Sequence, residues 1–222
     1  MGVNITAYKD IVKELQAQKV TLVAVSKFKS AEDIMELYEL GQRDFGENFV
    51  QELLLKQEVL PKDIRWHFIG HLQSNKVKYI APFVHLIHGV DSKKLLAEIN
   101  KQALKLDKEI HCLLQIHIAE EETKFGFGSH ELSELHEIHE LPGIKIDGLM
   151  GMASFTDDEQ KIKKEFGELK KAFDRANQLS TFNHQLSTLS MGMSSDYQLA
   201  IQSGSTMVRI GSLLFGSRNQ PA

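Results

Sequence analysis

Lys27 stands at the end of a valine-rich segment, residues 20–27, where a charged side chain is unexpected. In an extended strand the side chains of Val23, Val25 and Lys27 lie on the same side. If the valines point into a core, the lysine does too, and burying an unpaired ammonium costs several kcal/mol. Desolvation favours the neutral amine, which can attack an aldehyde. The alternative is a structural lysine that reaches solvent or pairs with Glu47.

Glycines and small hydroxyl side chains near the C-terminus could hold an anion. Gly211 and Ser212 follow the segment TMVRI. Ser190 lies near the end of the preceding apolar segment, residues 186–192, and Ser194 follows it. A glycine lets backbone N–H groups approach a phosphate, and a following helical turn adds its positive end. The alternative is that these glycines only shape turns.

Arg209 precedes Gly211 by two residues, so the two lie on the same side of a strand. An arginine cannot lose its proton in a protein and must donate to an acceptor. Two alternatives remain open from the sequence. Arg209 forms a buried ion pair with a carboxylate such as Glu47, or it donates to the anion or to an aromatic ring nitrogen.

Ten histidines raise the question of a metal site. His136 and His139 lie in HEIHE, which is not the HExxH pattern of zinc proteases, and the segment is typical of a solvated helix face. His111 and His117 share one side of a predicted strand. None of these spacings predicts a specific metal site.

The elements that would position these residues alternate regularly along the chain. Eight predicted strands are each followed by a helix or helical turn, which indicates a parallel sheet with right-handed crossovers. Eight repeats favour a single (β/α)8 TIM-type barrel, formed by residues 1–222 as one domain and preceded by an extra N-terminal helix over residues 5–18. An open doubly wound sheet is the alternative. The predicted strands are residues 20–27, 43–46, 65–70, 84–90, 110–118, 144–152, 186–192 and 206–211, and the helix after the fifth strand covers residues 130–141.

The unusual residues fall at the C-terminal ends of these predicted strands. They include Lys27, Asn48 and His71 after the first three strands, and Arg209 and Gly211 in the last. In a barrel this is the end at which active sites are built. The sequence therefore predicts one site at that end.

Composition excludes several other classes of protein. The net charge is −4, from 26 basic and 30 acidic residues, which gives no reason to expect nucleic acid or anionic lipid as a partner. Cys112 is the single cysteine, which fits a reducing compartment. No apolar run is long enough for a membrane span, and no signal peptide is recognised, so we expect a cytoplasmic protein.

Several long motifs resemble the pyridoxal phosphate homeostasis protein family, and the resemblance covers nearly the whole chain. It implies a barrel similar to the N-terminal domain of alanine racemase, and pyridoxal 5′-phosphate (PLP) bound as a Schiff base on Lys27. The motifs are VAVSK (23–27), FGENFVQE (45–52), WHFIGHLQSNK (66–76), GLMGM (148–152), LSMGMSSD (189–196) and GSTMVRIGSLLFGSR (204–218).

The resemblance also implies roles for individual residues. Arg209 should face the pyridine nitrogen, and Asn48 and His71 should line the cofactor. The phosphate should be held by the backbone amides of Gly211 and Ser212 and by the hydroxyls of Ser190 or Ser194.

The chain departs from the family pattern in two places. Phe49 replaces a common tyrosine, which removes a phenol hydrogen bond. Phe28-Lys29-Ser30 replaces a common Thr-Lys-Pro, which leaves any role of that threonine in doubt.

The resemblance implies a PLP carrier that maintains PLP and, indirectly, amino-acid and keto-acid balance, without an enzymatic activity. PLP-dependent apoenzymes are the possible partners, and we expect a monomer. A small PLP-dependent amino-acid racemase is the main alternative, and a sugar-phosphate enzyme is a weaker one. Racemisation needs an acid/base group on each face of the substrate carbanion. We see no second group in this chain, whose four tyrosines follow no recognisable catalytic pattern.

Overall fold

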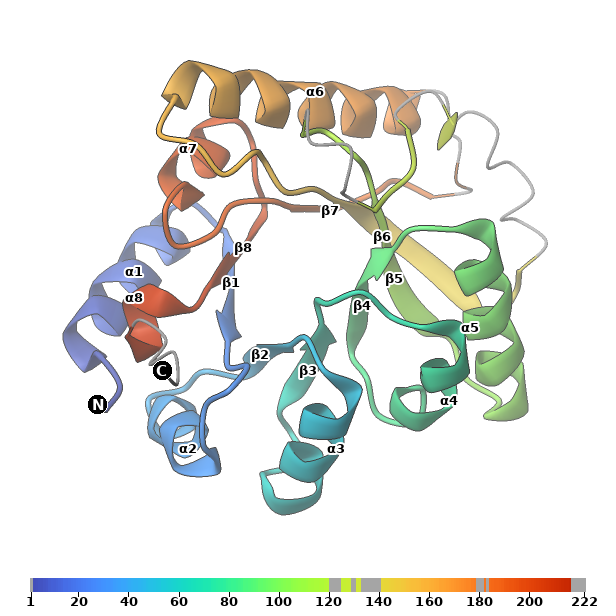
Figure 1. The fold of residues 1–222 in the computed structure, drawn as a ribbon, viewed down its shortest axis with the longest axis horizontal. Coiled ribbons are helices and arrows are strands. Elements are labelled where there is room, and N and C mark those ends of the chain that lie inside the picture. The colour runs from blue at the N-terminus through green and yellow to red at the C-terminus, as the bar shows by residue number, and fades with distance from the viewer. Residues whose placement is uncertain are drawn as a thin grey trace.

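The computed structural model describes residues 2–119, 125–128, 131–132, 141–178, 182 and 184–216. The strands of these residues form one closed parallel barrel, in which each strand pairs with the next and the last returns to the first (Figure 1). The predicted barrel is confirmed, and the open-sheet alternative is wrong. The strands are β1 (Thr21–Val25), β2 (Asp44–Glu47), β3 (Arg65–Phe68), β4 (Leu86–Val90), β5 (Ile110–Gln115), β6 (Ile144–Met150), β7 (Thr188–Ser190) and β8 (Met207–Ile210).

Helices surround the barrel on its outside (Figure 1). The predicted N-terminal helix is α1 (Ile5–Ala17), and the helix predicted over residues 130–141 lies mostly outside the described residues. None of the described helices is both long and apolar enough to cross a membrane. The others are α2 (Ala31–Glu39), α3 (Val50–Val59), the 3₁₀ turn η1 (Ser74–Lys76), α4 (Val77–Ile80), α5 (Lys93–Lys105), α6 (Glu159–Gln178), α7 (Tyr197–Gln202) and α8 (Ser212–Phe215).

Local sequence explains where α1 and α2 begin. The side chain of Asn4 accepts a hydrogen bond from the N–H of Ala7, and Ser30 and Asp33 form a reciprocal capping box. These side chains satisfy backbone donors that have no partner within the helix. Ser30 therefore caps α2.

The hydrophobic residues form two layers. A large cluster fills the space between the strands and the outer helices. A smaller cluster inside the barrel combines Val23, Leu86, Leu113, Met150 and Met207 from five strands. The inward position of Val23 confirms the side predicted for the alternate residues of β1.

Several strands are shorter than predicted. β1 ends at Val25, so Lys27 lies two residues beyond the strand, although the N–H of Ser26 still bonds to the carbonyl of Gly46 at 3.0 Å. β7 covers three residues, and Gly192, at φ 96°, turns the chain away from the barrel soon after it. A left-handed φ of this kind favours glycine.

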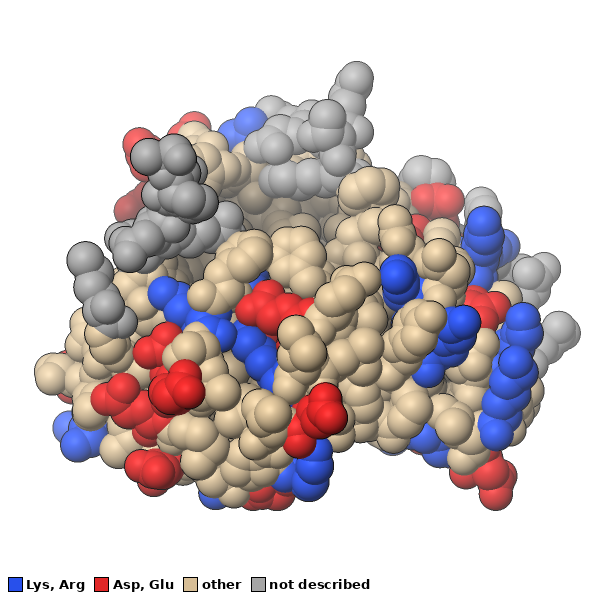
Figure 2. Space-filling view, turned by 60° about the horizontal axis from the view of Figure 1, so that its bottom comes forward, with Lys and Arg blue, Asp and Glu red and all other residues tan. Residues whose placement is uncertain are grey.

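Acidic and basic side chains both occur across the face that Figure 2 shows. This distribution agrees with the small net charge of the chain.

Candidate functional site

A cavity of about 540 Å³ opens beyond the carboxyl ends of the strands. Six of the eight predicted site residues line it, and Ser190 and His71 are not among the lining residues. The lining consists of Val25, Lys27, Lys29, Asn48, Ile69, Met152, Phe155, Met193, Ser194, Ser195, Arg209, Gly211, Ser212, Leu213 and Gly216.

The residues on both sides of Lys27 donate hydrogen bonds to buried or half-buried carboxylates. The hydroxyl of Ser26 donates to Oε1 of Glu47 at 2.6 Å, and the N–H of Phe28 donates to Oε1 of Glu52 at 2.6 Å. Phe28 adopts φ 62°, a left-handed conformation that is uncommon for a residue with a side chain. These contacts fix the direction in which the chain leaves β1 and place Lys27 in the cavity lining.

Glu47 is fully buried and pairs with Lys56, whose Nζ lies 2.7 Å from Oε1 of Glu47 and 2.6 Å from Oε1 of Glu52. Burial raises the pKa of Glu47, and the charge of Lys56 opposes this shift. The sequence analysis named Glu47 as a structural partner for Lys27 or Arg209 and did not single out Lys56. The i, i+4 spacing of Glu52 and Lys56 on α3 was the available signal.

Arg209 is 4% exposed, and its guanidinium donates to two acceptors. Nη1 donates to Oγ of Ser190 at 2.6 Å, and Nη2 donates to the carbonyl of Gly151 at 3.1 Å. Burial lowers the pKa of Arg209 to about 10, although the charge of Asp196 opposes the shift, so the guanidinium is charged at neutral pH. An arginine has five N–H donors, so this side chain retains donors for a ligand in the cavity.

Small residues from the loops after β7 and β8 form the opposite part of the lining. The N–H of Gly211 donates to Oγ of Ser194 at 3.2 Å, and Ser212 begins the single turn of α8. A Cβ atom at Gly211 would lie 3.3 Å from both Cβ and the carbonyl oxygen of Val25. The glycine therefore permits a close approach of β8 to β1, and backbone N–H groups of the following turn remain available to an anion.

Asn48 reaches the cavity from the end of β2, and its Oδ1 atom is buried without a hydrogen-bond partner among the described residues. Buried polar atoms are normally satisfied, so a ligand donor at this position would remove a cost. Gly70 permits this arrangement, because a Cβ atom there would lie 2.4 Å from the backbone oxygen of Asn48.

His71 lies beside the cavity rather than in its lining. Its side chain is 47% exposed, and its ring stacks on Phe125 with a centroid distance of 4.3 Å. Nδ1 of His71 lies 3.0 Å from Oδ2 of Asp91. A contact of His71 with a cofactor therefore stays a prediction.

Exposed aromatic side chains surround the cavity. Phe28 and Phe49 are 62% and 46% exposed, and their ring centroids are 5.1 Å apart. Phe155 lies in the lining and is 93% exposed. Phe49, which replaces the common tyrosine of the resemblance, thus packs on Phe28 and does not line the cavity.

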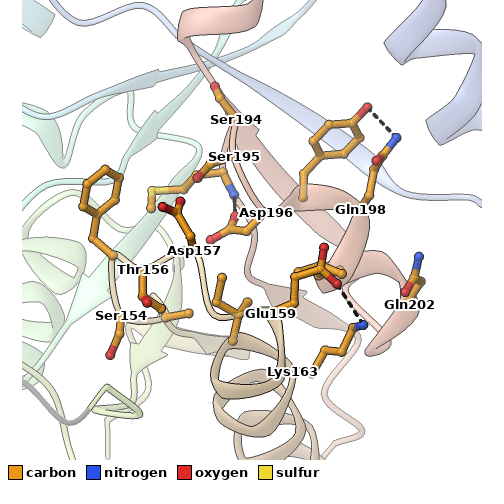
Figure 3. A pocket seen from close by; sticks show the side chains of 16 residues that line it. Ser154, Thr156, Asp157, Glu159, Lys163, Ser194, Ser195, Asp196, Gln198 and Gln202 are labelled. Carbon is orange, nitrogen blue, oxygen red and sulfur yellow. Dashed lines mark hydrogen bonds and ion pairs between the residues drawn. The ribbon is translucent and has the colours of Figure 1, made fainter.

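A second cavity, of about 740 Å³, adjoins the first and was not predicted (Figure 3). Both cavities are lined by Phe155, Met193, Ser194 and Ser195. The second is also lined by charged residues from the start of α6, including Glu159 and Lys163, which form an ion pair at 3.2 Å.

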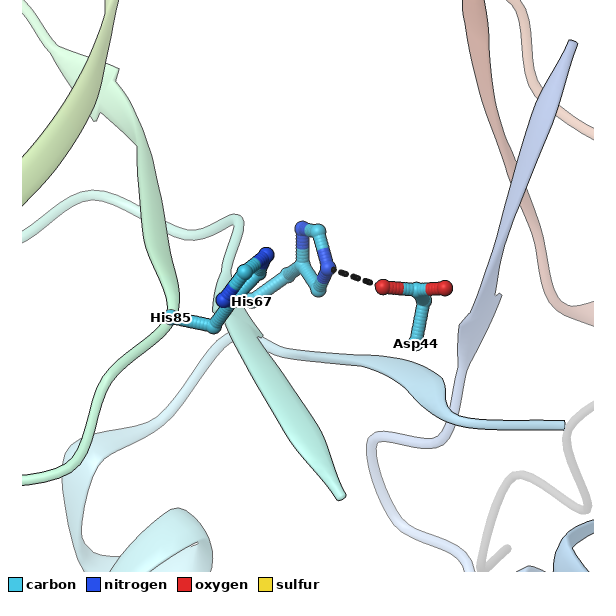
Figure 4. Close-up of side chains that lie close together, drawn as sticks. All are labelled: Asp44, His67 and His85. Atoms are coloured by element: carbon cyan, nitrogen blue, oxygen red, sulfur yellow. Dashed lines mark hydrogen bonds and ion pairs between the residues drawn. The ribbon is translucent and has the colours of Figure 1, made fainter. Parts of the chain in front are cut away.

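Asp44, His67 and His85 form a cluster at the other end of the barrel, with potential metal-ligand atoms within 4.8 Å of one another (Figure 4). However, Arg65 donates to both carboxylate oxygens of Asp44, at 2.7 and 2.5 Å. A cation would have to displace this guanidinium, so the cluster is better described as an ion-pair network. Of the histidines considered from the sequence, His111 bonds to an aspartate, and His136 and His139 lie outside the described residues.

The family model of the alanine racemase N-terminal domain matches residues 3–219 of this chain. The pyridoxal phosphate homeostasis protein of Aquifex aeolicus is 43% identical over 199 residues, covering 89% of this chain and 86% of the relative. The protein of the same name from Synechocystis is 40% identical over 216 residues, covering 96% and 98%.

Solved structures agree with these sequence matches. PipY of Synechococcus elongatus, solved with PLP bound, is 35% identical, has a TM-score of 0.82, and covers 92% of this chain and 98% of that one. Alanine racemase of Clostridium difficile has a TM-score of 0.79 at 15% identity and covers 99% of this chain and 59% of that one, which shows a shared fold. The chain therefore belongs to the pyridoxal phosphate homeostasis protein family, whose barrel is that of the alanine racemase N-terminal domain.

Proposed function

We propose that this protein binds PLP as a Schiff base on Lys27 and acts in PLP homeostasis as a carrier rather than as an enzyme. The observation that carries the proposal is the shared cavity of Lys27, Arg209 and the Gly211–Ser212 turn. An amine, a charged donor and an anion site in one lining match the three functional parts of PLP. The PLP-bound structure of PipY and the names of the relatives support the same conclusion.

The residues present fit this cofactor. The cavity volume of about 540 Å³ is within the usual range of small-molecule sites, roughly 300–1,000 Å³. PLP supplies an aldehyde that condenses with an amine and releases water. Lys27 provides that amine, and the unsatisfied oxygen of Asn48 offers an acceptor beside it.

The other lining residues bind and orient. The N–H of Ser212 and, in place of its bond to Ser194, the N–H of Gly211 would donate to the phosphate together with the Ser194 hydroxyl, and these bonds are charge-assisted. Arg209 donates to the ring nitrogen. Because Arg209 keeps its own proton, that nitrogen stays unprotonated, and the ring is then a poor electron sink.

The residues that surround Lys27 favour a carrier over a racemase. Racemisation requires a second acid/base group on the opposite face of the substrate. All four tyrosines are described, and none of them lines the cavity. Tyr8, Tyr38 and Tyr197 instead place their hydroxyls near Gln42, Asp63 and Glu14, at 3.4, 2.7 and 3.0 Å. Tyr79 is an exposed residue of α4.

Two measurements distinguish the candidate functions. The purified protein should show the visible absorbance of a PLP imine, whereas a sugar-phosphate enzyme would carry no such chromophore. L-alanine incubated at high protein concentration should keep its optical rotation. Rapid loss of rotation, absent in a Lys27→Ala control, would establish the racemase instead.

The proposal extends to the partners of the protein. We expect a monomer that passes PLP to PLP-dependent apoenzymes, with the exposed rings of Phe28, Phe49 and Phe155 around the exit. Transfer should be faster from the holoprotein to an apoenzyme than release into buffer. Equal rates would leave the protein as a reservoir of PLP rather than a donor, and light scattering would reveal a dimer.

A further inference from the structure

A continuous chain of buried polar side chains crosses the barrel interior and ends at Arg209. Asp44 is the first residue of β2 and so lies at the amino end of the barrel, opposite the cavity. Oδ1 of Asp44 lies 2.9 Å from Nε2 of His67, and Nδ1 of His67 lies 2.9 Å from Nε2 of His88. Nδ1 of His88 lies 3.2 Å from Oγ of Ser190, to which Arg209 donates at 2.6 Å.

All five residues of this polar chain are buried, with exposed fractions between 0% and 8%. Their donors and acceptors are therefore satisfied mainly by one another, and Asp44 also accepts from Arg65. His88 lies in a strand that is otherwise apolar, and His67 lies between Trp66 and Phe68, where a hydrophobic residue would pack without this requirement. Burying these polar side chains costs free energy, which indicates that they have a specific task.

The two ends of this polar chain fix the protons at those ends, and the charge state of His67 decides the protons between them. Arg209 can only donate, so Oγ of Ser190 accepts from it. The carboxylate of Asp44 can only accept, so Nε2 of His67 carries a proton. If His67 is neutral, its Nδ1 is unprotonated and accepts a hydrogen bond from Nε2–H of His88. Nδ1 of His88 is then also unprotonated and accepts a hydrogen bond from the hydroxyl of Ser190.

The surroundings of His88 favour its neutral form. Burial lowers the pKa of His88 well below its ordinary value, and the positive charge of Arg209 acts in the same direction. Burial opposes ionisation of Asp44, but the hydrogen bonds from His67 and Arg65 outweigh it and hold its pKa well below the ordinary value. The reverse proton direction would require a doubly protonated His67 facing Asp44.

We infer that His67 and His88 are positioning residues that commit the Ser190 hydroxyl to one direction, so that its oxygen accepts from Arg209 and holds the guanidinium in the cavity lining. The Ser190 proton is engaged by His88, so the hydroxyl does not compete for the acceptors of a ligand. Arg209 then keeps its remaining donors directed to the cavity. The consequence for cofactor binding rests on the proposed function, whereas the proton arrangement does not.

The proton arrangement can be tested in the cofactor-free protein by ¹⁵N NMR of labelled histidine rings. Resonances are assigned with His67→Asn and His88→Asn variants. Both rings should appear as neutral Nε2–H tautomers between pH 6 and 8. A cationic ring or an Nδ1–H tautomer at either position would overturn the inference, whatever the protein binds.

Two variants of His88 test the positioning role. An asparagine side chain places a polar atom near the position of Nδ1, so His88→Asn keeps an acceptor for Ser190 and loses the bond to His67. Glutamine reaches the position of Nε2, so His88→Gln keeps the bond to His67 and loses the one to Ser190. PLP retention should fall about tenfold in His88→Gln and at most about threefold in His88→Asn.

His85→Gln is the matched control. His85 lies at the edge of the His67 ring, with a centroid distance of 5.3 Å, but it is not a member of the polar chain from Asp44 to Arg209. It should retain PLP like the unchanged protein. Equal losses in both His88 variants would indicate a general packing defect and overturn the positioning role. If the unchanged protein binds no PLP, the proposed function fails, and the tautomers measured by NMR still decide the proton arrangement.

Discussion

Nη1 of Arg209, on β8, lies 2.6 Å from Oγ of Ser190, on the neighbouring strand β7. Both side chains are buried, and a second bond joins the guanidinium to the carbonyl of Gly151. This geometry supports a role for Ser190 in positioning the guanidinium of Arg209. The predicted contact of the Ser190 hydroxyl with a phosphate stays a prediction.

Replacing Arg209 by alanine should weaken PLP retention without preventing attachment to Lys27. The guanidinium is expected to meet the ring nitrogen, not the aldehyde, and a charged hydrogen bond contributes about 1.5–3 kcal/mol. We therefore expect the dissociation constant to rise roughly tenfold to a hundredfold. Titration of the apoprotein followed by visible absorbance measures this. An unchanged constant would assign Arg209 to structural support alone.

Gly211→Val should weaken PLP binding more than Ser194→Ala. The valine disturbs the backbone approach to the phosphate, whereas the serine variant removes one donor among several. A Cβ atom at residue 211 also approaches Val25 at 3.3 Å, so part of the effect would reach β1. Pyridoxal, which lacks the phosphate, separates the two causes. If Gly211→Val reduces PLP and pyridoxal affinity equally, the phosphate is not held at this turn.

Lys56→Met should destabilise the fold by about 3–5 kcal/mol, because it leaves Glu47 buried without its charged partner. The double variant Lys56→Met with Glu47→Gln should recover part of this loss in urea unfolding. Lys163→Met, which removes a surface pair with Glu159, is the control and should cost less than about 1 kcal/mol. A single Lys56 variant as stable as this control would contradict the account of the pair.

Asp44 should make the fold sensitive to acid. Burial disfavours its charge, but the hydrogen bonds from His67 and Arg65 depress its pKa below the ordinary 3.8. A depressed folded-state pKa stabilises the protein above the unfolded value, and this stabilisation is lost as the pH falls below about 3.8. The difference in unfolding free energy between the unchanged protein and Asp44→Asn should therefore shrink below that pH. A difference that stays constant as the pH falls below about 3.8 would contradict this account.

The sequence predicted the fold because alternation of apolar strands and amphipathic helices is a local property. It also predicted the cavity lining at Lys27, Arg209 and Gly211, because the alternate residues of a strand share a side. Val23 lies inside the barrel, and Lys27 lines the cavity although it stands two residues beyond the end of β1.

The polar chain through the barrel could not be predicted in the same way. Asp44, His67 and His88 are separated by about twenty residues along the sequence and meet only when neighbouring strands pair in register. Histidines within the apolar segments WHF and LIHGV were the available signal. His111, which shares one side of its predicted strand with His117, lies half-buried beside Asp147 instead.

The measurement that tests the central claim most directly is borohydride reduction of the protein with PLP, followed by peptide mass spectrometry. Lys27 should carry the reduced adduct, and Lys27→Ala should lose both the adduct and the imine absorbance while keeping its fold. Lys29, which lines the same cavity and donates to the carbonyl of Phe215 at 2.7 Å, is the matched control and should remain unmodified. An adduct on Lys29, or one that persists in Lys27→Ala, would contradict the assignment.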